Sequence, residues 1–244
     1  MNLTFENVCV KNILNNVSFT AASGKVTVMV GKNGSGKTTA LRAASGALKY
    51  SGKITAGDRD LLSVSAKQAA KLVSLMPQIL PAPQITVREL VRLGRFPYSG
   101  VYGSLSSEDE KKVSESLERA GVSELSARRV DRISGGERQR AFFALLLAQD
   151  TPVVMLDEAG AHLDAERKRE LNRDVRAIAD SGKTVLCVMH DINDALGIAD
   201  KIVLLDKGKL IFSGDAKEFC EKEYPEKIFS LSPYELKDGG VIYR

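Results

Sequence analysis

The most constraining feature of the sequence is the glycine-rich segment GKNGSGKTT at residues 31–39. It directly follows the apolar run VTVMV and leads into the helical pattern TALRAASGAL. A segment of the form G-x-x-x-x-G-K-[ST] between a strand and a helix folds into a loop whose backbone N–H groups surround a polyphosphate. A glycine-rich structural turn is disfavoured because all of these parts occur in order. We therefore expect a phosphate-binding loop at the end of a buried strand.

The expected loop gives particular side chains a chemical role. Lys37 supplies a positive charge to the β- and γ-phosphates, and the Thr38 hydroxyl is a ligand for Mg²⁺. The residues assigned to nucleotide binding in this loop are Gly31, Lys32, Asn33, Gly34, Ser35, Gly36, Lys37, Thr38 and Thr39. A polyphosphate and Mg²⁺ are therefore the expected ligands.

Short apolar runs alternate with helical patterns near both ends of the chain. The strand-like runs are β-branched and apolar on both faces, which is typical of buried parallel strands. They cover residues 26–30, 153–156, 184–189 and 201–205, and a helical pattern covers residues 165–179. We therefore expect an α/β fold with a mainly parallel sheet.

The middle of the chain follows a different pattern. Beyond the proline-rich break PQILPAPQ it shows few strand signals, and helical segments are expected near residues 87–94, 107–120 and 136–149. The sequence predicts a single domain, with an α/β core at residues 1–78 and 150–244 and an inserted helical subdomain at 79–149. Residues 215–244 are expected to form an extension that packs on the core.

The composition excludes several classes of protein. A chain of 244 residues with 43% hydrophobic content can bury a full core, and its three scattered cysteines are expected to be reduced thiols. The longest apolar run, AFFALLLA, is far shorter than the roughly 20 residues that span a bilayer, and the N-terminus lacks a signal-peptide layout. We expect a chain that is neither secreted nor membrane-spanning by itself. A net charge of +4 with both signs interspersed predicts no nucleic-acid partner.

Two adjacent carboxylates follow the apolar run VVML. Ligands of parallel α/β sheets bind at the carboxyl ends of the strands, and successive side chains of an extended segment point in opposite directions. Asp157 is therefore assigned to Mg²⁺ and Glu158 to the general base that polarises an attacking water. Alone, the Asp-Glu pair would be an ordinary helix N-terminus, but the phosphate-binding loop favours the catalytic interpretation.

Two other polar residues lie at similar junctions. His190 follows the strand-like run TVLCVM, where it can hydrogen-bond a γ-phosphate. Gln78 lies where the α/β core gives way to the helical segment, and the sequence alone favours a polar linker residue there. The other histidine, His162, is expected to be structural.

A second helix start, ISGGERQR at residues 133–140, is also suited to binding phosphate. Ser134 can cap a helix, and two glycines let the backbone approach a ligand closely. One nucleotide does not need two phosphate sites, so this segment requires a separate explanation.

The combination of GKNGSGKT, Gln78, SGGERQ, VVMLDE, Asp164 and His190, in this order, resembles the nucleotide-binding subunit of an ABC transporter. The resemblance covers essentially the whole chain. It implies a P-loop NTPase (RecA-like) core with a mainly parallel sheet, an N-terminal antiparallel β part and an inserted helical subdomain. It also implies that ATP and Mg²⁺ are the cofactors and that Gln78 contacts both Mg²⁺ and the catalytic water.

The same resemblance implies a head-to-tail dimer with a second copy of the chain. Ser134, Gly135 and Gly136 would then bind the γ-phosphate of a nucleotide held by the other copy, and Glu137 is assigned to the same nucleotide-binding segment. A helix N-terminus with unpaired N–H groups fits that role. Asp164 would belong to the loop that crosses the dimer interface.

The segment GRFPY at residues 94–98 resembles a stretch common in the import subunits of iron–siderophore, haem and cobalamin permeases. This implies a peripheral subunit on the cytoplasmic face of the cell membrane, with transmembrane permease subunits as partners. An extracytoplasmic substrate-binding protein would be an indirect partner. A generic helix-ending loop with exposed aromatic side chains is the alternative for this segment.

Other functions remain alternatives for the whole chain. These are an ABC ATPase of another importer class, serving a metal ion or amino acid, and a soluble ABC protein outside transport. A small-molecule kinase would leave SGGERQ without a function.

The sequence also departs from the usual pattern of this family. Residues 8–12 offer no aromatic side chain to stack on adenine, and Ala159-Gly160-Ala161 replaces the usual Pro-Thr-Ser. Lys32 replaces a frequent proline, and Leu146 stands where an arginine is common. We therefore expect weak base stacking and a looser turn after Glu158, because glycine adds backbone freedom.

Overall fold

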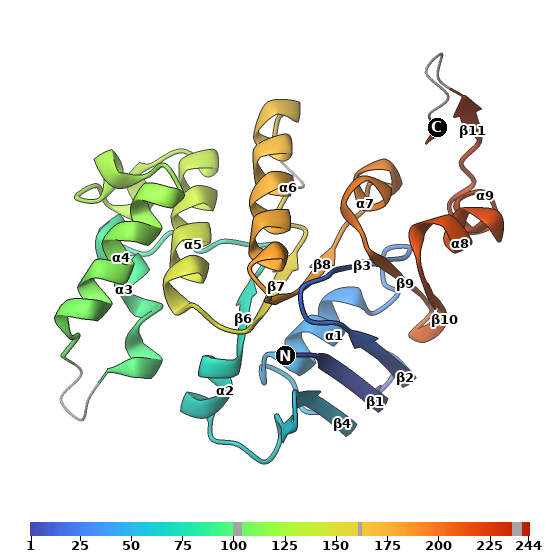
Figure 1. Ribbon diagram of the computed structural model, residues 1–244, viewed down its shortest axis with the longest axis horizontal. Helices are drawn as coiled ribbons and strands as arrows, with labels where there is room; N and C mark the ends of the chain where they lie inside the picture. Colours follow the sequence, from blue (N-terminus) through green and yellow to red (C-terminus); the bar gives the residue numbers. More distant parts are fainter. Residues whose placement is uncertain (100–103, 161–162, 236–240) are drawn as a thin grey trace.

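A six-stranded sheet forms the centre of the computed structural model, which describes residues 1–99, 104–160, 163–235 and 241–244 (Figure 1). The strand order is β10-β9-β3-β8-β7-β6. The strands are β3 (Val26–Val30), β6 (Val73–Met76), β7 (Val153–Asp157), β8 (Thr184–Val188), β9 (Lys201–Asp206) and β10 (Lys209–Gly214). All neighbours pair in parallel except β9 and β10, so the predicted mainly parallel sheet is confirmed.

The central strands are apolar on both faces because both faces of the sheet are covered. Every residue of β3, β7 and β8 is buried. The four strands predicted from apolar runs are present, with ends that shift by at most one residue.

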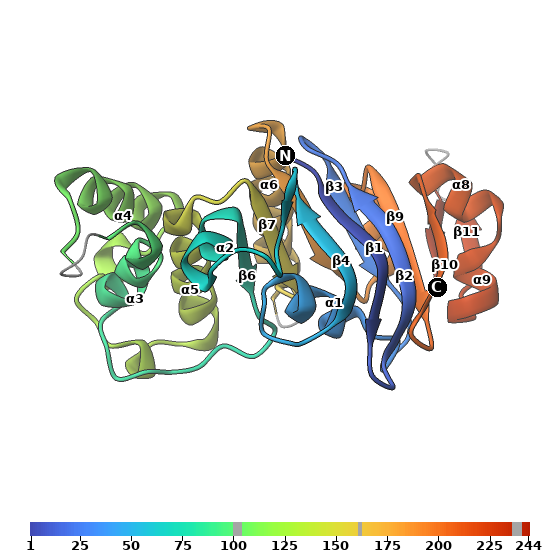
Figure 2. The same ribbon diagram turned by 90° about the horizontal axis from the view of Figure 1, so that it is seen from below.

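One face of the central sheet is covered by a second, antiparallel sheet and a helix (Figure 2). The second sheet, in the order β2-β1-β4-β5, consists of β1 (Leu3–Val10), β2 (Leu14–Ala21), β4 (Ser51–Ala56) and β5 (Arg59–Asp60), and the helix is α1 (Lys37–Ala44). Phe5 of β1 and Leu41 of α1 share a buried cluster with Met29 and Leu186 of the central sheet. The N-terminal antiparallel β part is therefore confirmed.

Helices cover the opposite face of the central sheet. Helices that contact its strands include α5 (Gly135–Gln149), α6 (Ala165–Asp180) and α7 (Ile192–Ile198), whereas α3 (Val87–Leu93) and α4 (Ser107–Arg119) pack on α5. The shorter helical segments are α2 (Ala66–Leu72), η1 (Phe96–Tyr98), η2 (Ser123–Leu125) and η3 (Val130–Arg132). In Figure 1, α3, α4 and α5 lie together to one side of α6. Among the described residues, no helix is both long and apolar enough to cross a membrane.

The helices α3, α4 and α5 agree with the predicted helical segments to within one residue at each end. Each of these helices begins with a capping box. The hydroxyl of a Ser or Thr accepts a hydrogen bond from the backbone N–H of the acidic residue three positions later, and the side chain of that acidic residue accepts one from the backbone N–H of the Ser or Thr. Their buried side chains belong to the same cluster as one face of the central sheet. Because the core is shared, the subdomain boundaries at residues 79 and 149 stay a prediction.

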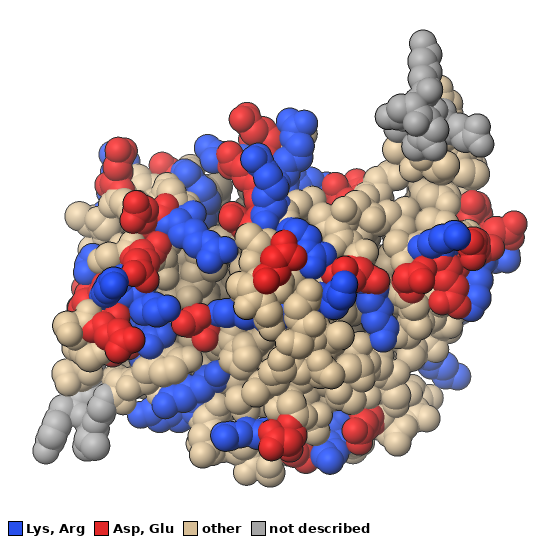
Figure 3. All heavy atoms as spheres, in the orientation of Figure 1, with Lys and Arg blue, Asp and Glu red and all other residues tan. Residues whose placement is uncertain are grey.

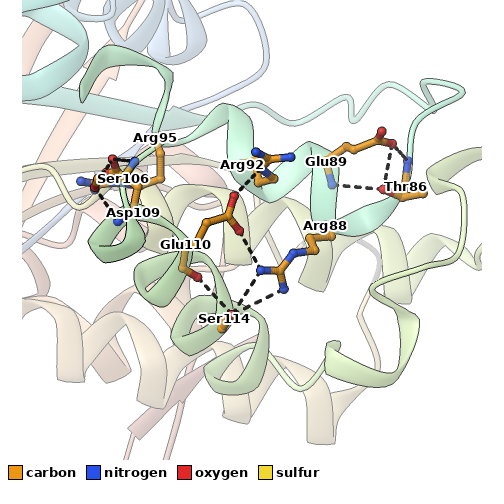
Figure 4. A network of polar contacts seen from close by, with 9 residues as sticks. All are labelled: Thr86, Arg88, Glu89, Arg92, Arg95, Ser106, Asp109, Glu110 and Ser114. Atoms are coloured by element: carbon orange, nitrogen blue, oxygen red, sulfur yellow. Dashed lines mark hydrogen bonds and ion pairs between the residues drawn. The ribbon is translucent and has the colours of Figure 1, made fainter. Parts of the chain in front are cut away.

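A polar network joins these helices to each other (Figure 4). Arg95, which follows α3, forms an ion pair of 2.8 Å with Asp109 of α4, and both side chains are only 10% exposed. Arg95 Nη1 also donates to the carbonyl of Ala148 in α5 at 2.8 Å. Glu110 on α4 accepts from Arg88 and Arg92 of α3 at 2.7 and 2.8 Å. The buried Arg95 therefore links all three helices, and the two more exposed ion pairs of Glu110 add links between α3 and α4.

The C-terminal segment packs on the core, as predicted. It contains α8 (Ala216–Glu221), α9 (Tyr224–Phe229), β11 (Pro233–Glu235) and β12 (Val241–Tyr243). The rings of Phe212, Phe219 and Tyr224 cluster with centroids 5.2 to 5.7 Å apart. Asn193 of α7 donates to the carbonyl of Tyr243 at 3.0 Å and accepts from its N–H at 2.8 Å.

Candidate active site

The glycine-rich loop leaves β3 and enters α1 in a conformation that requires glycine at two positions. A Cβ atom at Gly31 (φ +151°) would lie 2.2 Å from the carbonyl oxygen of Leu205, and one at Gly36 (φ +101°) would lie 2.4 Å from Leu14 Cδ2. The N–H of Gly208 donates to the carbonyl of Ser35 at 3.1 Å, which ties the loop to the turn after β9. The loop is therefore fixed by the sheet around it.

Lys37 lies inside this loop. Its Nζ donates to the carbonyls of Gly31 at 2.7 Å and Lys32 at 3.2 Å, and the residue is 5% exposed. Burial lowers the pKa of Lys37, while the nearby carboxylates of Glu158 and Asp157 act in the opposite direction. A second source of negative charge in the loop, such as a phosphate, would favour the charged form further.

Thr38 and Asp157 meet where a cation is expected. Thr38 Oγ1 donates to Asp157 Oδ1 at 3.1 Å, and Asp157 is 2% exposed. Burial raises the pKa of Asp157, and the hydrogen bond from Thr38 partly offsets that shift. The described residues contain no group of three or more His, Cys, Asp or Glu that could hold a metal. A hydroxyl and one carboxylate fit Mg²⁺, which takes oxygen ligands and keeps several waters or phosphate oxygens.

Glu158 is held between two polar side chains. Gln78 Nε2 donates to Glu158 Oε2 at 2.5 Å, and His190 Nε2 lies 2.5 Å from Glu158 Oε1. The Glu158 side chain is 8% exposed, and its backbone φ is +52°, a region uncommon for residues other than glycine. Strained backbone of this kind clusters at functional sites. The structure thus brings together the three side chains that the sequence analysis assigned to catalysis.

These groups border one cavity of about 560 Å³. Its lining consists of Ile13, Asn33, Gly34, Ser35, Gly36, Lys37, Thr38, Thr39, Gln78, Glu158 and His190. The cavity joins the glycine-rich loop to the polar side chains that follow β6, β7 and β8.

Ile13 is the lining residue that the sequence analysis missed. It lies in the turn between β1 and β2, 45% exposed, beside the glycine-rich loop. The sequence showed that residues 8–12 lack an aromatic side chain, but it did not locate this turn. Ile13 therefore gives one end of the cavity an aliphatic surface on which a flat ring can pack.

The remaining predicted residues lie around a different cavity. Ser134, Gly136, Glu137 and Asp164 border a cleft of about 710 Å³ between α5 and α6, and its described lining shares no residue with the first cavity. Ser134 and Glu137 cap α5 by accepting from each other's backbone N–H. A Cβ atom at Gly135 or Gly136 would meet nothing within 4 Å, so this helix start faces open space.

Asp164 has a local structural role in this chain. Its Oδ1 accepts from the N–H groups of Glu166 at 3.1 Å and Arg167 at 2.9 Å, which caps α6. His162, which the sequence analysis took as structural, lies outside the described residues.

The sequence is similar to several characterised proteins. The ABC transporter family matches residues 14–161. The achromobactin transport ATP-binding protein CbrD of Dickeya dadantii is 36% identical over 230 residues, which cover 91% of this chain and 83% of the relative. The iron(3+)-hydroxamate import ATP-binding protein FhuC of Bacillus subtilis is 33% identical, with 90% and 82% covered. The ferric enterobactin transport ATP-binding protein FepC of Escherichia coli is 32% identical, with 90% and 82% covered.

Solved structures agree on the fold. A metal-chelate type ABC transporter in an inward-facing conformation gives a TM-score of 0.82 at 22% identity, covering 99% of this chain and 95% of that chain. A nucleotide-free ATP-binding cassette from an ABC transporter gives 0.78 at 22% identity, with 94% and 96% covered. The expected P-loop NTPase fold is confirmed.

Replacing Ile13 with tyrosine should tighten the binding of adenine nucleotides. An aromatic ring at this position can stack on the base, and such a contact contributes about 0.5 to 1.5 kcal/mol, or roughly twofold to 13-fold in Kd. Titration with a fluorescent ATP analogue, followed by competition with ATP, would measure the change. Ile211→Tyr is the matched control, because Ile211 is 43% exposed on β10 and does not line the cavity. An unchanged or larger Kd for Ile13→Tyr would contradict the placement.

Proposed function

The chain belongs to the ABC transporter family. On this premise we propose that it is the ATP-binding and ATP-hydrolysing subunit of an importer. The observation that carries the catalytic part is the Glu158 carboxylate held between Gln78 and His190 at the cavity of the phosphate-binding loop. The importer part is supported by relatives named for achromobactin, iron–hydroxamate and enterobactin transport. The proposed cargo is therefore an iron chelate or a related cofactor such as haem or cobalamin.

The proposed mechanism assigns a separate task to each group in the cavity. The loop N–H groups and Lys37 bind the phosphates, and Thr38 and Asp157 would hold Mg²⁺ together with Gln78. When bound, Mg²⁺ supplies positive charge that offsets charge on the phosphate oxygens.

Glu158 accepts a proton from the attacking water in this proposal. Each of its oxygens has one protein partner and retains a lone pair for the water. Gln78 and His190 orient the carboxylate, and His190 is exposed enough, at 44%, to reach a γ-phosphate in the same cavity.

A second copy of the chain would complete each nucleotide site. The open helix start at Ser134, Gly135 and Gly136 borders a cleft separate from the phosphate-binding loop. Because α5 has 15 residues, its N-terminus carries the partial positive charge of a full helix dipole. This supports a head-to-tail arrangement in which the start of α5 and the Asp164 loop of one copy face ATP held by the other.

Docking to a permease is proposed for a groove near η1. The groove, of about 640 Å³, is lined by the end of α1, by α2, by β6 and by Leu62 in the turn after β5, which is 56% exposed. Phe96 projects from η1 with 66% of its surface exposed, and η1 contacts α2. An apolar rim beside a groove fits a short cytoplasmic helix of a permease.

The structure changes one part of the expectation for residues 94–98. Tyr98 is held in place: its hydroxyl donates to the carbonyl of Gln149 at 2.9 Å, and the Arg95 guanidinium lies 3.9 Å from its ring centroid. Only Phe96 of the two aromatic residues is free to contact a partner, so the proposed docking surface consists of Phe96 and the adjacent groove.

The proposal places the subunit at the cytoplasmic face of a membrane, bound through the permease. A substrate-binding protein on the other side would deliver the cargo. On the face shown in Figure 3, basic and acidic side chains are interspersed, with uncharged areas between them. This mixture supports transport over a function on nucleic acid, which would favour a continuous basic surface.

Glu158→Gln should bind ATP normally but lose turnover by about 100-fold or more, because the base is removed while the phosphate-binding groups remain. Steady-state hydrolysis and equilibrium ATP binding would be measured on the same preparation. Glu221→Gln, whose side chain on α8 is 62% exposed, is the control and should hydrolyse ATP like the wild type. Near-normal hydrolysis by Glu158→Gln would reject the assignment of the base.

Mixing two inactive variants should restore part of the activity if two copies form each site. In a mixed dimer of Lys37→Ala and Ser134→Arg subunits, one site carries both defects and the other carries neither. Random association would give about a quarter of the wild-type rate. Hydrolysis would be measured as a function of the mixing ratio. No recovery, with mixed dimers demonstrated by crosslinking, would count against the trans arrangement.

Phe96→Asp should abolish ATP-dependent uptake but leave hydrolysis by the isolated subunit unchanged, because it alters only the proposed docking surface. Leu62→Asp, in the groove beside η1, should have the same effect, whereas Ile211→Asp on β10 should have none. Uptake into vesicles with the co-expressed permease would provide the measurement. Full uptake by both groove variants would remove this surface from the interface.

A further inference from the structure

Lys168 on α6 contacts both chain segments that position Glu158 and His190. Its aliphatic part lies over Gly160, where an added Cβ would be 3.7 Å from Lys168 Cγ and 3.8 Å from Cε. Its ammonium group forms ion pairs with Asp194 and, at 3.8 Å, with Asp191 Oδ2. One side chain therefore spans from the loop after β7 to the start of α7.

The two segments that Lys168 joins are the immediate neighbours of the reacting groups. Gly160 follows Glu158 by two residues, and Asp191 directly follows His190. Glu158 Oε1 and His190 Nε2 in turn lie 2.5 Å apart. Lys168 therefore joins the two segments on one side, and the contact between Glu158 and His190 joins them on the other.

The described part of the loop after Glu158 is held by backbone hydrogen bonds: the N–H of Glu158 donates to the carbonyl of Val188 at 3.2 Å, and the carbonyl of Gly160 accepts from the N–H of Leu163 at 3.3 Å. Ala159 and Gly160 carry minimal side chains, and glycine has the greatest backbone freedom of any residue. A cavity of about 290 Å³ lies beneath them, lined by Leu171, Cys187 and Met189 among others. Lys168, Asp191 and Asp194 border the same cavity, so the ion pair forms part of its wall.

The exposure of these groups indicates what the ion pair can contribute. The Lys168 side chain is 31% exposed, and those of Asp194 and Asp191 are 25% and 50% exposed. Partly exposed pairs add at most about 1 kcal/mol to global stability. A displacement of a catalytic group by about 1 Å can cost up to 100-fold in rate. The larger effect of Lys168 is therefore expected on turnover.

We propose that Lys168 is a positioning residue for ATP hydrolysis. It holds the loop that carries Glu158 against the helix that follows His190, and it compensates for the glycine at position 160. The proposal rests on the roles assigned to Glu158 and His190 above. In this role Lys168 acts on hydrolysis through these two residues.

The test measures kcat, KM for MgATP and the urea midpoint of the full chain for a set of variants. Lys168→Met keeps the aliphatic part and removes the charge, so kcat should fall by about tenfold with KM and the midpoint unchanged. Lys168→Arg should retain most of the activity. Asp194→Asn should resemble Lys168→Met, because it removes the closer partner of the ammonium group.

A charge swap separates positioning from general packing. Lys168→Asp and Asp194→Lys should each lower kcat strongly, and the double variant should exceed both single variants. Arg176→Met is the matched control on the same helix, because Arg176 pairs with Asp200 at 2.7 Å with similar exposures of 34% and 24%. That pair ties α6 to the start of β9 and should not affect kcat.

Three results would overturn the proposal: a wild-type kcat for Lys168→Met, an equal loss for Arg176→Met, or no rescue in the folded double variant. Glu158→Gln distinguishes this failure from a failure of the proposed function. If Glu158→Gln is inactive while Lys168→Met is fully active, the positioning role alone is wrong. If Glu158→Gln turns over normally, the assignment of the base is wrong, whatever Lys168 does.

Discussion

Parallel pairing of three adjacent strands is the constraint on which the catalytic centre depends. Val188 of β8 lies opposite Met29 of β3 on one side and Asp157 of β7 on the other. All three strands therefore end at one edge of the sheet, and the phosphate-binding loop, Glu158 and His190 emerge side by side. The N–H of Glu158 donates to the carbonyl of Val188 at 3.2 Å, which extends the pairing into the site. A shift of one residue in this register would reverse the direction of every side chain at the edge.

The sequence predicted the central sheet well because its strands are buried on both faces. A short, uniformly apolar run between turn signals, such as Val26–Val30, is typical of a buried strand and fits few other structures. The N-terminal strands were expected only from the family resemblance. Strand β1 alternates irregularly between buried and exposed residues, and Asn7, with φ of 51°, lies where its pairing with β2 shifts register. Such irregularity hides the period of a strand, and for the same reason the turn that places Ile13 beside the cavity was missed.

Site residues could be predicted from the sequence where their partners lie close to them in the chain. Glycines, Lys37 and Thr38 act within one loop, so their spacing in the sequence was sufficient. Gln78 looked like a linker residue because its partner Glu158 is 80 positions away and only the pairing of β6 with β7 brings them together. Lys168 was overlooked for a similar reason. A lysine on a helix with many charges looks like a solvated residue until its contacts with another helix are known.

The buried Arg95 has a mechanical consequence. By binding Asp109 and the carbonyl of Ala148, it joins the end of α3 and the start of α4 to the last turn of α5. The 15 residues of α5 then form a rod of about 22 Å between this junction and Ser134. Because α5 is one continuous helix, a displacement of Arg95 would move both ends of it, including the helix start at Ser134.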